Sequence, residues 1–196
     1  LSTGLTGFVA TGNSNYGWLA TGTSVIRIDF SNDSGTTSPR GPLSLARTGL
    51  SATGNSNYGW FGGGLTGIPS LSTVDRIDFS NDSSTASPRG PLSSARYRLA
   101  ATGNSNYGWF GGGASPASVS TVDRIDFSND SSTASLRGPL SLARFNLSAT
   151  GNSNYGWFGG GAVPTPAVFS TVERIDFTND SATASSRGLL SLARQQ

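Results

Sequence analysis

The sequence contains no cysteine, no histidine and no methionine, and all 13 of its basic residues are arginine. Without cysteine there is no disulfide framework and no thiol chemistry. Without histidine the chain lacks the most common general base and the most common ligand of zinc, copper and iron. We therefore expect a protein that is not an enzyme, with no catalytic residues, no cofactor and no metal site.

Long apolar runs and clusters of positive charge are also missing. No stretch approaches the length of a membrane span, and the first residues show no signal-peptide pattern. The net charge is only +2, and the arginines are spread thinly rather than gathered in a basic stripe. We therefore expect neither a membrane nor a nucleic acid as a partner. Because the chain opens on Leu1 and has no methionine, we expect a fragment or an engineered subset of a longer protein.

One unit of sequence occurs four times. Each unit carries GNSNYGW, then RIDF, and closes on SxAR, and successive closing arginines lie 49, 48 and 50 residues apart. A period near 50 residues is typical of a β-propeller blade and exceeds that of helical-pair repeats. We predict one all-β domain with units at about 1–47, 48–96, 97–144 and 145–196. The recurring residues that we interpret as structural are Trp18, Trp60, Trp109, Trp157, Arg47, Arg96, Arg144, Arg194, Asp29, Asp78, Asp126 and Asp176.

The second unit shows how each repeat divides into four antiparallel strands. Short apolar or alternating segments, separated by turn-forming residues, predict strands at 50–53, 58–61, 73–79 and about 85–92. The fourth segment carries Pro88, and proline belongs on an edge strand because it cannot donate to a ladder. By the same pattern, the first strand of the chain is expected at about 6–11 and the last at about 185–190.

The order of these motifs resembles the kelch repeat. An aromatic strand ends in a pair of glycines, a Val-acid strand follows, and the unit closes on a proline-containing strand and an arginine. The matching diglycines are Gly62-Gly63, Gly111-Gly112 and Gly159-Gly160, and the matching Val-acid pairs are Val74-Asp75, Val122-Asp123 and Val172-Glu173. The resemblance implies a β-propeller of four-stranded antiparallel blades, with four blades in this chain.

Two departures from the kelch pattern affect the prediction. Kelch repeats usually have a tryptophan on the fourth strand, where this chain has Thr85-Ala86-Ser87. We expect Trp60 and its equivalents on the second strand to fill that space between blades. The first unit lacks the diglycine and has Leu19-Ala20-Thr21-Gly22 instead.

Ring closure is the open question that four blades raise. Each blade must cover its neighbour, so an array of blades leaves two faces exposed unless the ring closes. The chain could close as a tight ring of four, or two chains could join end to end as a ring of eight. We favour the homodimer of eight blades, since kelch-like blades more often form larger rings.

The recurring polar residues have structural interpretations. We expect the repeated arginines to form bidentate ion pairs between blades with Asp78 and its equivalents. The tryptophan and tyrosine of NYGW are expected in the core between blades, although they could also stack on sugar rings. The Asn-Asp-Ser turns supply one carboxylate each, which favours a hydrogen-bonded turn over a calcium site.

The units differ most in the loop after the glycines. Loops on a rigid scaffold often carry binding residues, and tolerant drift is the alternative. We predict a non-catalytic scaffold or protein-interaction module whose partners are a second copy of itself and a protein ligand. The alternative is a glycan-binding propeller with one weak site per blade. The candidate rim residues are Leu65, Ile68, Pro69, Ser115, Pro116, Val163, Pro164 and Pro166.

Overall fold

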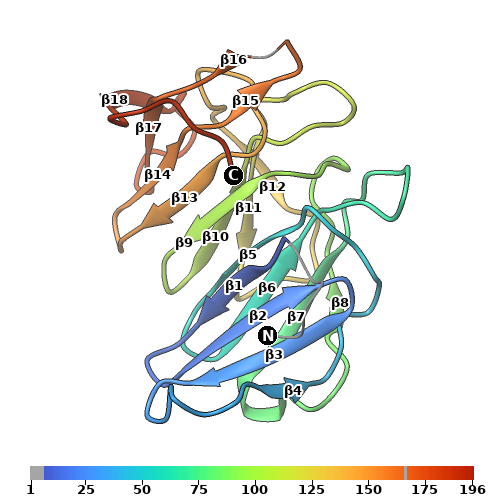
Figure 1. Ribbon diagram of the computed structural model, residues 1–196. Coiled ribbons are helices and arrows are strands. Elements are labelled where there is room, and N and C mark those ends of the chain that lie inside the picture. The colour runs from blue at the N-terminus through green and yellow to red at the C-terminus, as the bar shows by residue number, and fades with distance from the viewer. Residues whose placement is uncertain (1–6, 166) are drawn as a thin grey trace.

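The computed structural model describes residues 7–165 and 167–196, which form four four-stranded antiparallel sheets (Figure 1). The all-β class and the four-stranded sheets predicted from the repeat are confirmed. In the described ranges no helix is long and apolar enough to cross a bilayer. Sheets 1 to 4 follow the order of the repeats along the chain.

Each sheet is built from the strands of one repeat, and in sheet 4 a short hairpin interrupts their sequence. Sheet 1 contains β1 (Val9–Gly12), β2 (Tyr16–Thr21), β3 (Ser24–Asp29) and β4 (Ser38–Arg40). Sheet 2 contains β5 (Ser51–Gly54), β6 (Tyr58–Gly62), β7 (Val74–Asp78) and β8 (Ser87–Arg89). Sheet 3 contains β9 (Ala100–Gly103), β10 (Tyr107–Gly111), β11 (Val122–Asp126) and β12 (Ser135–Arg137). Sheet 4 contains β13 (Ser148–Gly151), β14 (Tyr155–Gly159), β17 (Thr171–Asp176) and β18 (Ser185–Leu189).

Between β14 and β17 the chain forms a short hairpin of β15 (Ala162–Val163) and β16 (Ala167–Val168). It occupies the variable loop after the glycines of the fourth unit. The only helical element among the described residues is a single 3-10 turn, η1 (Phe79–Asn81), directly after β7. The predicted strand 73–79 therefore ends one residue early, because the Asp78 carboxylate accepts a hydrogen bond from the Ser80 amide and starts a turn.

The outer strands match the proline prediction in position but are shorter than expected. Pro39 and Pro88 lie in β4 and β8, which are edge strands of their sheets. The strand expected at 85–92 covers only Ser87–Arg89. In the first unit the strand expected at 6–11 begins at Val9, and Thr6 lies outside the described residues.

Successive sheets pack face to face and share their hydrophobic cores. Trp18 and Val25 of sheet 1 lie in one buried cluster with Phe61 and Ile77 of sheet 2. Two further clusters join sheets 2 and 3 and sheets 3 and 4 in the same way. The innermost strands β1, β5, β9 and β13 pack against one another in that order. Among the described residues, no hydrogen bond or ion pair joins sheet 1 to sheet 4.

A glycine directly after the outer strands β4, β8 and β12 permits the close approach of the next sheet. The Gly41 amide donates to the Asp82 carbonyl at 2.8 Å, and Gly90 and Gly138 make the same bond to the following repeat. A Cβ on Gly90 would overlap the Ser132 carbonyl oxygen. The equivalent Gly188 of sheet 4 has no atom within 4 Å of that position, so this end of the array is uncovered.

Replacement of Gly90 by alanine is expected to lower the free energy of unfolding by at least about 1 kcal/mol, because the added methyl group overlaps backbone of the next repeat. Gly188→Ala is the matched control and should leave the stability of a single chain unchanged or slightly higher. Urea unfolding followed by circular dichroism measures both. Equal destabilisation by the two variants would contradict the packing described for this glycine.

Candidate functional site

The outer part of each junction between sheets is organised by one carboxylate. In the junction of sheets 2 and 3, the Trp60 indole Nε1 donates to Asp130 Oδ2 at 2.9 Å. Arg76 donates to the same oxygen at 3.0 Å, and the Arg89 guanidinium lies 3.6 Å from it. Phe127 stacks on Trp60 with ring centroids 3.7 Å apart. Sheet 2 thus supplies two hydrogen-bond donors and a second guanidinium group, and sheet 3 supplies the acceptor and the stacking ring.

The same outer contact occurs in the other two junctions. Trp18, Arg27 and Arg40 of sheet 1 converge on Asp82 of sheet 2, and Phe79 covers the indole. Trp109, Arg124 and Arg137 of sheet 3 converge on Asp180, with Phe177 as the stacking ring.

The inner part of each junction is a fully buried ion pair. Arg96, which closes the second unit, donates to Asp123 Oδ2 at 2.7 Å and to the carbonyls of Gly112 and Phe110 at 3.0 and 2.9 Å. The Ser93 amide also donates to this carboxylate. Arg96 and Asp123 are both completely buried. The equivalent pairs are Arg47 with Asp75 and Arg144 with Glu173.

Burial opposes the charge on Arg47 and Arg144, and the acidic partner of each offsets this effect in part. Desolvation lowers the pKa of Arg47 and of Arg144, while the carboxylates of Asp75 and Glu173 act in the opposite direction. The closing motif SxAR therefore acts as a clamp: its arginine and its serine both bind the acid of the following sheet. Neither charge of such a pair is available to an external ligand.

The RIDF aspartates make different contacts from those expected. We expected ion pairs between blades with Asp78 and its equivalents, and this expectation is wrong. Asp78 instead accepts from both the hydroxyl and the amide of Ser80, at 2.6 and 2.9 Å. The Ser80 hydroxyl bond is the main cause that lowers the pKa of Asp78. Equivalent local bonds lower the pKa of Asp29, Asp126 and Asp176.

The acids that do join the sheets were underestimated from the sequence. The sequence pattern places Asp75 in a Val-acid pair and Asp82 in a turn, and neither placement predicts a contact with another sheet. Both positions carry an acid in the second, third and fourth units, and both are buried there. That recurrence was a usable signal, because a buried acid requires a cationic or hydrogen-bonded partner.

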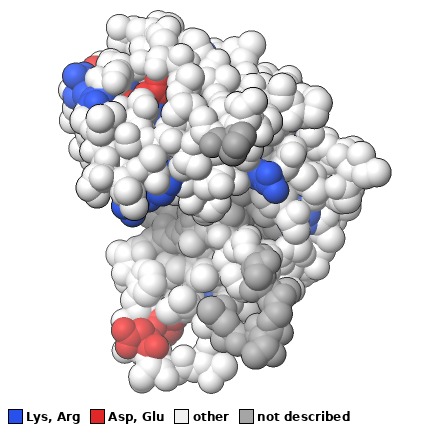
Figure 2. Space-filling model, turned by 45° about the horizontal axis from the view of Figure 1, so that its top comes forward, with Lys and Arg blue, Asp and Glu red and all other residues white. Residues whose placement is uncertain are grey.

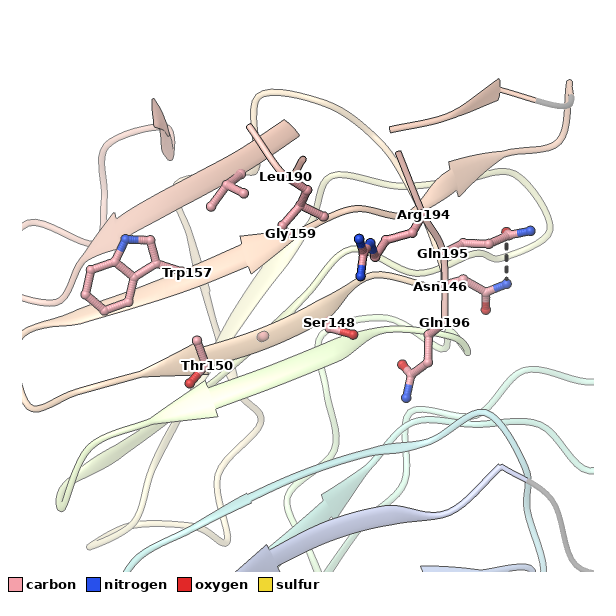
Figure 3. Close-up of a pocket in the computed structure, with 11 residues that line it drawn as sticks. Asn146, Ser148, Thr150, Trp157, Gly159, Leu190, Arg194, Gln195 and Gln196 are labelled. Carbon is pink, nitrogen blue, oxygen red and sulfur yellow. Dashed lines mark hydrogen bonds between the residues drawn. The ribbon is translucent and has the colours of Figure 1, made fainter. Parts of the chain in front are cut away.

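The tryptophans fill the space between sheets, as predicted, except in sheet 4. Trp18, Trp60 and Trp109 are completely buried, whereas Trp157 is only half-buried and lines an open pocket. Arg194, the closing arginine of the fourth unit, is exposed instead of buried. Figure 3 shows Trp157 and Arg194 at opposite ends of this pocket on β13, β14 and the C-terminal segment.

The variable loops hold the predicted rim residues. Ile68 is 96% exposed at the tip of its loop. The Ser70 hydroxyl lies 3.5 Å from that of Ser115, so the loops of the second and third units are neighbours. Leu65 and Val163 are half-buried at the base of their loops. Pro69, Pro116 and Pro164 belong to the same loops, and Pro166 lies outside the described residues.

No metal-binding constellation is found in the part of the chain that the structure describes, where no three acidic side chains gather at one point. The junction carboxylates are engaged by arginine, tryptophan and serine. No family model and no curated protein matches this sequence.

Truncation of Arg96 to alanine is expected to destabilise the protein by about 3–5 kcal/mol, because Asp123 would remain buried without a counter-charge. Arg194→Ala is the matched control at the equivalent, exposed position and should change stability by less than about 0.5 kcal/mol. Guanidinium or thermal unfolding of both variants measures the difference. A similar loss of stability in both variants would show that the buried ion pair is not the cause of the destabilisation.

Removal of the Ser80 hydroxyl should raise the pKa of Asp78 toward its ordinary value. A folded-state pKa below the unfolded one gives stability that is present above the unfolded pKa and is lost as the pH falls through the folded pKa. Ser80→Ala should therefore move acid unfolding to a higher pH. Carboxyl-carbon NMR titration follows the pKa, and Ser84→Ala, whose hydroxyl bonds Asn81 instead, is the control. An unchanged Asp78 pKa in Ser80→Ala would contradict this assignment.

Proposed function

We propose that the four sheets are blades of a kelch-type β-propeller, and that the protein is a non-catalytic scaffold for protein interaction. The observation that carries the proposal is that the recurring side chains form the contacts between sheets. In the three complete junctions, every repeated tryptophan, closing arginine and junction acid binds the neighbouring sheet. The residues that the repeat retains are therefore those that join one sheet to the next.

The binding surface proposed for a partner protein is the set of variable loops. They begin after the glycines, where the chain leaves the second strand of each sheet, and they differ in length and apolar content between units. Their ends are held in a uniform way: the Leu71 amide donates to Gly64, and the equivalent Val119 amide donates to Gly113. Fixed ends and variable tips suit a loop that can change without loss of the fold.

The glycan-binding alternative has less support. Complete burial of Trp18, Trp60 and Trp109 leaves none of these indoles open to a sugar ring. The tyrosines of the same motif are partly covered, since the Arg76 guanidinium lies 4.3 Å from the Tyr58 ring centroid, and three other units have the same stacking.

Exchange of the loop 65–72 for the shorter loop 114–120 of the third unit tests the scaffold proposal. The exchanged chain should keep its circular-dichroism spectrum, and its melting temperature should change by no more than a few degrees, because the two loops share their anchoring bonds. As a matched comparison, Arg96→Ala keeps all loops and removes a junction contact. Unfolding of the loop-exchanged chain would contradict the proposal, because the loops would then be part of the core.

A further inference from the structure

The open pocket of sheet 4 is one half of a junction. Its wall contains Trp157, Gly159, Val172 and Leu190, at positions that are buried against a following sheet in the other repeats. Trp157 has no stacking ring from another repeat among the described residues, whereas Trp18, Trp60 and Trp109 each have one. Sheet 4 therefore presents the donor side of the junction without its acceptor.

The charged donors of this face are present too. The Arg174 guanidinium stacks on Tyr155 at 4.1 Å, as its equivalents do on their own tyrosines, but it has no ion pair with any described residue. Its Nε is buried without a hydrogen-bond partner among the described residues. Arg187, the equivalent of Arg40 and Arg89, is exposed.

Sheet 1 presents the matching acceptor side. Phe30, the equivalent of the stacking rings of sheets 2 to 4, is 52% exposed. Asp33, the equivalent of the junction acids Asp82 and Asp130, is exposed and has no ion pair in the described structure. Figure 2 shows arginines mainly on its upper part, where some acidic side chains also lie, and a group of acidic side chains on its lower part.

We propose that the open face of sheet 4 binds sheet 1 of a second copy of this chain, and that two chains in this way close one ring of eight sheets. The inference rests on the proposed scaffold function. Phe30 of one chain then stacks on Trp157 of the other, and Asp33 accepts from Trp157 and Arg174 and forms an ion pair with Arg187. Gly188 takes the place that Gly41 and Gly90 have within the chain, against the backbone of the adjoining repeat.

The joint between chains differs from the internal junctions in its inner part. Sheets 2, 3 and 4 carry a cross-strand pair of phenylalanine and acid, such as Phe110 with Asp123. Sheet 1 has Leu19 opposite Ile26 at the same register. Arg194 thus meets no carboxylate on docking, and its partners are limited to backbone carbonyls. The joint keeps the outer contact and lacks the buried ion pair, so it is weaker than the three internal junctions.

Light scattering on a sizing column, repeated over a range of concentrations, tests the pairing. The unmodified chain should elute at about 40 kDa, twice its mass of 20.1 kDa. Gly188→Ala should elute at about 20 kDa with an unchanged circular-dichroism spectrum, because its methyl group meets nothing within the chain but would overlap the second copy. Asp33→Arg should also give single chains, and Asp33→Arg combined with Arg187→Asp should restore the pair.

Each other result overturns the inference. A mass of about 20 kDa at all concentrations excludes the second copy and leaves closure within one chain or a different occupant. A larger mass excludes a ring of two chains. A pair that survives both Gly188→Ala and Asp33→Arg uses a different surface. None of these results affects the scaffold proposal, which depends on the loop exchange and on single-chain stability.

The missing ion pair supplies a second measurement. Ile26→Asp places an acid opposite Arg194 and should lower the dissociation constant of the pair at least about tenfold, as close interfacial charge pairs do. In the background of Arg194→Ala the same substitution should give no gain. Sedimentation velocity on the four combinations measures the coupling. If Ile26→Asp does not raise the affinity of the pair when Arg194 is present, residues 26 and 194 do not face each other in the joint.

Discussion

The carboxylate of Asp82, Asp130 or Asp180 holds each pair of successive sheets together, because it accepts two hydrogen bonds from the preceding repeat and forms an ion pair with a second arginine of that repeat. A buried acid with one partner would barely offset its desolvation. Here an indole and two guanidinium groups share the negative charge, and the stacked phenylalanine shields them from water. Each sheet depends on its neighbour for these contacts, so the stability of the array is a property of junctions rather than of single sheets.

The absence of lysine follows from the same geometry. Arg96 uses three different nitrogens, one for the carboxylate and two for backbone carbonyls of the next sheet. Arg76 binds Asp130 with its edge while its flat face covers Tyr58. A lysine ammonium has neither a planar face nor a fork of donors, and it could meet only one of these demands at a time. Arginine at every repeated basic position is therefore a structural requirement of the junctions.

The fold could be predicted from the sequence because its signals are local and repeated. The period, the aromatic strands and Pro88 on an edge strand depend on residues close together in the chain. The ion-pair partners could not be derived in this way, because each unit offers several acids and the choice depends on how two sheets pack. Asp78 illustrates the difficulty. Its carboxylate accepts hydrogen bonds from Ser80, two residues later, and not from a residue of a neighbouring sheet. An Asp-x-Ser pattern predicts such a local bond.

The first unit departs from the repeat at positions that face away from sheet 2. Leu19 and Ile26 stand in place of a phenylalanine and an acid, while Phe30 and Asp33 are kept. Within the array, loss of the acid would leave a buried arginine without a counter-charge. The same substitution in sheets 2 to 4 would therefore greatly lower the stability of the protein. At sheet 1 the change removes a charge that the proposed docking of a second copy would otherwise desolvate. In the proposed pairing of two chains, the retained aromatic and acidic groups determine the register of the joint, and the apolar pair makes it weaker than the internal junctions.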